Sequence, residues 1–98
     1  MDTITLAAAP FNDQSYHRYE MTPIQSKMAR VALGWGTRDL AQKANVSPDT
    51  VARLERGERL RAATIEAIRN TFEAAGIQFI PENGGGAGVR FQKPATSD

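Results

Sequence analysis

The sequence predicts a small, mainly α-helical domain in which four helices are followed by a C-terminal β-hairpin. Its 98 residues are 41% apolar and contain no run near the ~20 apolar residues that span a bilayer, which indicates one small core. Between residues 21 and 76, apolar residues recur at helical spacing and capping residues precede them. After residue 76 the spacing changes to two, around a glycine-rich turn, which is typical of a hairpin.

The first helix is expected to begin at Thr22, a good N-cap, with Pro23 in the first position, where no amide is needed. It should end near Gly34. Its apolar residues fall at i, i+4, i+7 and i+8 and are predicted to face the core: Ile24, Met28, Val31 and Ala32.

A second capping residue, Thr37, predicts a helix of about two turns, with Asp39 in its first turn, where the helix dipole favours an acid. Asn45 tolerates the left-handed conformation, so the chain can reverse there without glycine, and Val46 should enter the core. The inward residues of this helix are predicted to be Leu40, Ala41 and Ala44.

Ser47 is predicted to cap the third helix, with Pro48 in its first position and Gly57 as its stop. Val51 and Leu54 should face inward. Two short helices joined by a tight turn form a helix-turn-helix.

The fourth helix is predicted from the 3, 4, 3 spacing of Ile65, Ile68, Phe72 and Ala75, and it should end at Gly76. The hairpin follows, with strands around Ile77 to Ile80 and Val89 to Phe91. Its NGGGAG turn lacks the Gly-Lys-Ser/Thr ending of a phosphate loop, so a plain turn is the favoured interpretation. A lone hairpin is marginal in water, so it must pack on the helices or pair its edge with another chain.

Four regions result: a flexible N-terminal tail (residues 1–20), the helical domain (residues 21–76), the hairpin (residues 77–92) and a C-terminal tail (residues 93–98). The aromatic cluster of the first tail, Phe11, Tyr16 and Tyr19, could instead dock on the domain or on a partner, although a flexible terminus is favoured. The first charge is Asp2, so the basic start of a secretory signal is missing, and a cytoplasmic protein is expected.

Composition and charge narrow the function. The chain has no cysteine, and its single histidine, His17, has no partner for catalysis or metal binding, so no enzyme, no cofactor and no metal are expected. Residues 21–75 carry nine Lys or Arg and six Asp or Glu, a net charge of +3, whereas both ends are neutral or acidic. An anionic partner such as nucleic acid could use this excess, although mixed charge is ordinary for a soluble domain.

The segment from Thr37 to Gly57, TRDLAQKANVSPDTVARLERG, resembles the helix-turn-helix of the Cro/C1, or Xre-type, family of prokaryotic and phage DNA-binding regulators. The resemblance extends over Pro23 to about Ala75. The chain departs from the family at Arg38, where Gln is common, and at Asn45, where Gly is common. The family pattern is met by Leu40, Ala41, Ala44, Asn45 to Ser47, Val51 and Glu55 to Gly57. The hairpin resembles that of members that dimerise through a C-terminal strand.

The predicted DNA contacts lie on the outward face of the third helix, which would enter the major groove by its first turn. The base contacts are predicted to be Ser47, Pro48, Asp49, Thr50 and Arg53, with Arg53 suited to guanine and Asp49 equally suited to stabilising the helix dipole. The phosphate contacts are predicted to be Thr37, Arg38, Arg56, Arg59 and Arg61, the alternative being ion pairs with Glu55, Glu58 or Glu66. Trp35 is interpreted as a packing residue rather than a stacking platform for bases.

These observations predict a sequence-specific transcriptional regulator, a repressor or an activator, that binds double-stranded DNA as a homodimer on a palindromic operator. The dimer is expected to form through Ile77, Phe79, Ile80, Val89 and Phe91. The alternative is a protein-interaction module, an antiactivator or antitoxin that binds a regulator, a polymerase or a toxin. No membrane association is expected.

Overall fold

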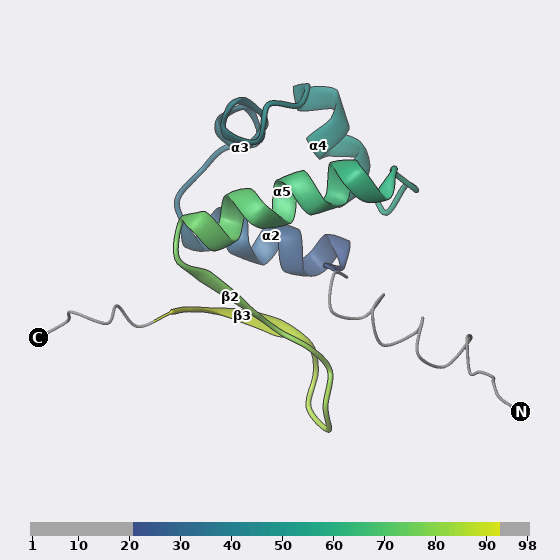
Figure 1. The fold of residues 1–98 in the computed structure, drawn as a ribbon. Coiled ribbons are helices and arrows are strands. Elements are labelled where there is room, and N and C mark those ends of the chain that lie inside the picture. The colour runs from purple at the N-terminus through teal and green to yellow at the C-terminus, as the bar shows by residue number, and fades with distance from the viewer. Residues whose placement is uncertain (1–20, 93–98) are drawn as a thin grey trace, which may run out of the picture.

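The computed structural model describes residues 21–92, within which four helices precede a two-stranded hairpin (Figure 1). The elements are α2 (Pro23–Ala32), α3 (Thr37–Ala44), α4 (Pro48–Glu55), α5 (Ala62–Ala74), β2 (Ile77–Ile80) and β3 (Gly88–Phe91). In Figure 1, α3 and α4 lie on one side of α5 and the hairpin on the other. The predicted fold class is confirmed. Both predicted tails, with His17 and the aromatic cluster, lie outside the described residues, and none of the described helices could cross a membrane.

The core joins the helices to the hairpin. Its fully buried large side chains include Leu40, Val51, Ile68 and Phe72, as their helical spacing predicted. Trp35 is half-buried and stacks on Phe72 with 5.9 Å between ring centroids, which confirms its packing role.

The hairpin packs on the helices, the first of the two arrangements that the sequence left open. Strands β2 and β3 are antiparallel, with Ile77 opposite Phe91 and Phe79 opposite Val89, so these four side chains share one face. Ile77 and Phe79 are buried, and the rings of Phe79 and Phe72 pack in a T-shaped arrangement with 6.0 Å between their centroids. The hairpin therefore belongs to the core of the domain.

The prediction of the inward face of α2 was wrong. Its cap is as expected, because Thr22 and Gln25 form a capping box, but the predicted inward residues are exposed. Ile24 and Val31 are 60% and 63% exposed, and Met28 and Ala32 are exposed as well. The buried residues are Gln25, Ser26 and Ala29.

The physical reason is the hairpin, which packs against α2. The Gln25 side chain donates from Nε2 to the carbonyl oxygens of Ile80 (3.1 Å) and Gly88 (2.9 Å), while its Oε1 accepts from the Thr22 amide (3.1 Å). Short side chains at Ser26 and Ala29 allow close packing beside these bonds. The buried Gln25 amide is thus satisfied by partners on the hairpin and at the cap, whereas the buried Ser26 hydroxyl has no hydrogen-bond partner among the described residues.

The helix-turn-helix forms as predicted, with one correction. The N-cap of α3 is Gly36, not Thr37. The Asp39 carboxylate accepts a hydrogen bond from the Gly36 amide at 2.7 Å, so Asp39, which was predicted to interact with the helix dipole, also helps to cap the helix. Asn45 ends α3 in the left-handed conformation, with φ of 60°. Ser47 caps α4, and its hydroxyl accepts from the Thr50 amide.

An ion pair connects α2 to the end of α4. Arg30 donates from Nε and Nη2 to the two carboxylate oxygens of Glu55, at 2.6 and 3.1 Å, and from Nη1 to the Trp35 carbonyl oxygen at 3.0 Å. Both charged side chains are only 13–14% exposed. Glu55 is therefore structural, so it is no longer a candidate partner for the surface arginines.

Candidate nucleic-acid interface

The outward face of α4 carries all five residues predicted to contact bases. Val51 and Leu54 are fully buried, so the opposite face of the helix points to solvent. Ser47, Pro48 and Asp49 are exposed at its leading end, while Thr50 and Arg53 are partly exposed one turn along. A convex helix face with its first turn exposed matches the shape that enters a major groove.

The first turn of α4 is ordered by its own cap. The Ser47 hydroxyl accepts from the Thr50 amide at 3.1 Å and lies 2.9 Å from the Thr50 hydroxyl. Each hydroxyl keeps a lone pair or a proton for a base edge, since a hydroxyl has one donor and two acceptor positions. The two side chains are thus held in one arrangement before DNA arrives.

Arg53 and Arg56 share one acid. Arg53 Nε donates to Glu58 Oε1 at 3.1 Å, and Arg56 Nε donates to Glu58 Oε2 at 2.9 Å. The hydrogen bonds from Arg56 and Arg53 hold the pKa of the Glu58 carboxyl below its usual value. In the free protein, Arg56 therefore forms an ion pair with Glu58, one of the alternatives predicted from the sequence. Arg53, which was predicted only as a base contact, pairs with the same acid.

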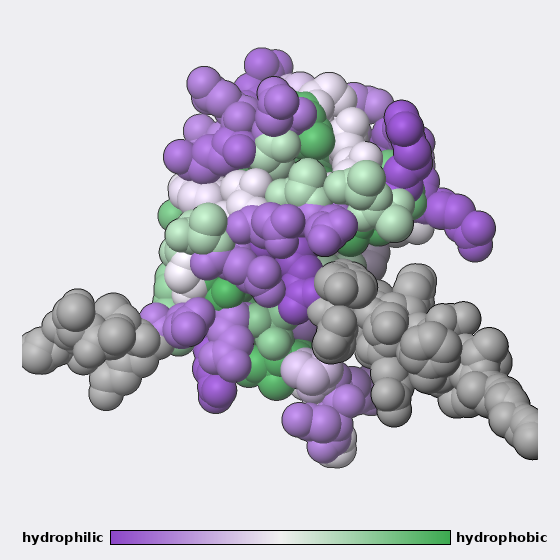
Figure 2. All heavy atoms as spheres, viewed as in Figure 1, coloured by the Kyte–Doolittle hydropathy of each residue, from purple (hydrophilic) through white to green (hydrophobic). Residues whose placement is uncertain are grey.

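The remaining predicted phosphate contacts frame α4. Thr37 is half-buried at the start of α3, and Arg38 beside it is exposed. Arg59 and Arg61 are exposed in the connection from α4 to α5, and neither forms an ion pair with a described residue. Figure 2 shows hydrophilic side chains gathered over α3 and over this connection. Cations on both sides of a recognition helix are suited to the two phosphate strands that border a groove.

A comparison with protein-family models supports this geometry. A model described as helix-turn-helix matches residues 27–74, which include all of α3, α4 and α5 and more than half of α2. The chain belongs to the Cro/C1-type helix-turn-helix family. It is a DNA-binding helix-turn-helix regulator, and this family is one of regulatory DNA-binding domains rather than of enzymes. A comparison with curated proteins found no match.

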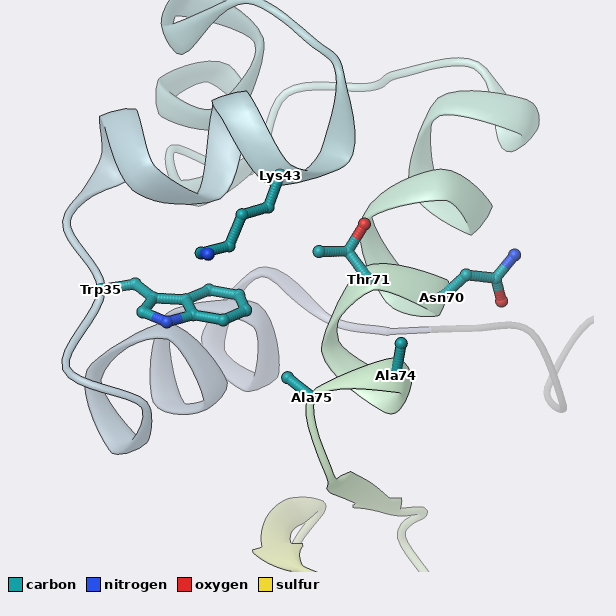
Figure 3. Close-up of a pocket in the computed structure, with 6 residues that line it drawn as sticks. All are labelled: Trp35, Lys43, Asn70, Thr71, Ala74 and Ala75. Atoms are coloured by element: carbon teal, nitrogen blue, oxygen red, sulfur yellow. The ribbon is translucent and has the colours of Figure 1, made fainter.

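This Cro/C1-type domain also has a shallow pocket of about 440 Å³ between α3 and α5 (Figure 3). Lys43 Nζ lies over the Trp35 ring, 5.1 Å from its centroid, and the Thr71 hydroxyl is already bound to the Ala67 carbonyl oxygen. The Lys43 cation and the Trp35 indole therefore already form a cation–π contact with each other. The other lining residues are Asn70, Ala74 and Ala75.

Sequence reasoning did not single out Glu58 as a residue of this interface. It was named as one of three possible ion-pair partners, because alternating charges in RLERGER do not show which pairs form. The available signal was the position of Glu58 directly after Gly57. A glycine that ends a helix in the left-handed conformation turns the next residue back toward the last turn, where Arg53 and Arg56 lie.

Proposed function

We propose that the protein is a sequence-specific transcriptional regulator that binds a palindromic operator as a homodimer, with α4 in the major groove. The observation that carries this proposal is the composition of the exposed α4 face. A capped first turn with Ser47 and Thr50 precedes a guanidinium group at Arg53, and these groups can bond base edges. Exposed cations at Arg38 and Arg59 flank the helix and would bind phosphates of any sequence.

The experiment is selection from a pool of random DNA duplexes by the purified full chain, followed by sequencing of the retained DNA. A regulator of this kind should enrich a symmetric site with half-sites about 10 base pairs apart. Enrichment of a single half-site would contradict the dimer but not base recognition. No enriched sequence at modest salt would refute the proposal.

The fold leaves only part of the predicted dimer surface exposed. Ile77 and Phe79 are buried within their own chain, so they would support an interface from beneath rather than form it. Phe91 is 58% exposed, and β3 pairs with β2 alone among the described strands, so its outer edge has no strand partner. Ile80 and Val89, the two other predicted residues, are partly buried.

Helix α2 extends this surface, because it packs beside β3 and exposes Ile24, Met28 and Val31. Together with Phe91, these are the exposed large hydrophobic residues of the described chain. A two-fold axis along the β3 edge would bury the strand edge and this apolar face in one interface, and it would pair two copies of α4 for a palindrome. A single core of this size is marginal, so burial by a second copy would also add stability.

Charge substitutions test this dimer better than deletion of the hairpin, which would remove Ile77 and Phe79 from the core. Val31→Lys and Phe91→Lys place a cation in the proposed interface, while Gln78→Lys does so at an exposed position of β2 as a control. Light scattering should show a dimer for the wild type and Gln78→Lys, and monomers for the other two. A dimer that survives both Val31→Lys and Phe91→Lys would refute this interface.

A second candidate function is a protein-interaction module that binds a regulator, a polymerase or a toxin. The apolar face of α2 is the observation that favours it, since exposed apolar residues at helical spacing suit a partner protein. This function predicts that the chain enriches no DNA sequence and that Val31→Lys leaves its oligomeric state unchanged. The two experiments above therefore discriminate between the candidates.

A further inference from the structure

We propose that Glu58 is a positioning residue for DNA recognition: its carboxylate orients the Arg53 guanidinium toward a base and restrains Arg56. This inference rests on the proposed function, because it concerns how α4 discriminates between base pairs. It predicts that an acid, which repels DNA, nevertheless improves the sequence specificity of this surface.

The end of α4 fixes the position of Glu58. The Gly57 amide donates to the Leu54 carbonyl oxygen at 2.9 Å, and the Glu58 amide donates to the Arg53 carbonyl oxygen at 3.0 Å. Gly57 has φ of +87°, so these two hydrogen bonds form the Schellman motif that often ends a helix. The Glu58 backbone is thus bound directly to that of Arg53, and its carboxylate lies within reach of both guanidinium groups.

The carboxylate divides its two oxygens between the arginines. Oε1 accepts from Arg53 Nε, and Oε2 accepts from Arg56 Nε and lies 2.8 Å from Arg56 Nη2. The terminal nitrogens of Arg53 form no hydrogen bond with the described residues, so they remain available for the O6 and N7 atoms of a guanine. Arg56, with two of its nitrogens engaged, is held back from the groove.

Stability does not explain this cluster. The side chains of Arg53, Glu58 and Arg56 are 41%, 44% and 57% exposed, and ion pairs that exposed contribute little to folding. The cluster can instead favour DNA binding, because a long side chain that is already ordered loses less conformational entropy when it binds. Since the arginines lower the pKa of Glu58, the carboxylate stays ionised at neutral pH and the arrangement persists there.

Glu58 also subtracts one charge from the surface that meets the phosphates. Replacing it with Gln keeps the shape of the side chain but frees Arg56 for a phosphate. Affinity for random duplex should then rise, and the slope of log K against log salt should steepen by about one unit. Discrimination at the base pair read by Arg53 should fall, because its guanidinium is no longer oriented.

The test compares Glu58→Gln with Glu82→Gln, an identical charge change at an exposed position between β2 and β3. The connection between these strands lies on the far side of α5 from α4 (Figure 1). Each protein is titrated with the selected duplex, with a duplex altered at the Arg53 base pair, and with random duplex. Glu58→Gln should lower the ratio of the first two affinities about three- to tenfold, part of the discrimination of a bidentate contact. Glu82→Gln should leave it unchanged.

Two further measurements isolate the mechanism. In an Arg53→Ala background, Glu58→Gln should no longer change the ratio, because Glu58 acts through Arg53. Without DNA, the NMR signal of the Arg53 Nε–H should exchange more slowly with water than that of Arg61, which has no ion pair among the described residues, and Glu58→Gln should abolish the difference.

The outcomes separate this inference from the proposed function. If the wild type enriches no sequence, the proposed function fails. If it enriches a site but Glu58→Gln raises all affinities equally, Glu58 acts as a charge alone and the positioning role is refuted. Equal exchange of the Arg53 and Arg61 Nε–H groups would refute it as well, whether or not DNA binds.

Discussion

Replacing Arg30 with Met should destabilise the fold by about 3 kcal/mol. Arg30 makes two hydrogen bonds to the Glu55 carboxylate and a third to the Trp35 carbonyl oxygen, and both charged side chains are only 13–14% exposed. Removing one partner of a buried pair costs about 3–5 kcal/mol, because the other charge is left uncompensated. The small remaining exposure to water places the expected value at the lower end of this range.

Such a loss is large for this domain. At about 0.05–0.15 kcal/mol per residue, the 72 described residues would have a free energy of unfolding of about 4–11 kcal/mol. The Arg30–Glu55 pair also joins α2 to the last residue of α4, so its loss should loosen the recognition helix. Urea unfolding of the full chain, followed by circular dichroism, measures the change directly.

The control is Arg56→Met, which removes a cation from an ion pair that is 57% and 44% exposed and should change the free energy by less than about 1 kcal/mol. The double variant Arg30→Met/Glu55→Leu should recover much of the loss, since no charge stays buried without a partner. The reasoning fails if Arg30→Met costs no more than the control, or if the double variant costs the sum of two large single losses.

Three more predictions concern recognition and packing. Arg53→Ala should cost about 1–3 kcal/mol on the selected site and relax preference at one base pair, whereas an equal loss on all sequences would make it a phosphate contact. Arg38→Ala should weaken binding to every duplex and make the salt slope shallower by about one unit, and an unchanged slope would exclude a phosphate contact. Gln25→Ala should cost about 2–3 kcal/mol in urea unfolding, because three hydrogen bonds are lost, while the exposed Gln42→Ala serves as control. A Gln25 variant as stable as the Gln42 variant would show that its bonds to the hairpin add nothing.

The sequence predicted the helix-turn-helix well because its signals are local. Ser47, Pro48 and Asn45 each determine backbone geometry within one turn, through a cap, a fixed φ or a left-handed turn. The burial of Leu40 and Val51 follows from helical spacing between two such signals. The prediction of Thr37 as N-cap was wrong by one residue, because Asp39 can cap Gly36 from inside the helix and a sequence does not show which of two adjacent residues takes that position.

The charged part of the site was less predictable. The choice of partners among Arg30, Arg53, Glu55 and Glu58 depends on which residues the tertiary fold brings together. Arg30 and Glu55 are 25 positions apart and meet only because α2 packs against α4. Glu58 meets Arg53 because a backbone motif turns the chain back. The alternation of charges along the sequence predicts neither pair, because it is compatible with several sets of ion pairs.

Helix α2 shows how a correct pattern can lead to a wrong assignment of faces. Ile24, Met28 and Val31 do repeat at helical spacing, and such a stripe normally indicates a buried face. Spacing predicts that a face needs cover, but it does not identify what covers it. Within the chain, α2 packs on the hairpin, α4 and α5, and Gln25 on its buried face donates hydrogen bonds to two carbonyl oxygens of the hairpin. The proposed dimer would account for the stripe, since a second copy would bury the residues that the domain leaves exposed. If Val31→Lys leaves the chain dimeric, the stripe must have another partner, and the protein-interaction candidate gains the same residues as its binding surface.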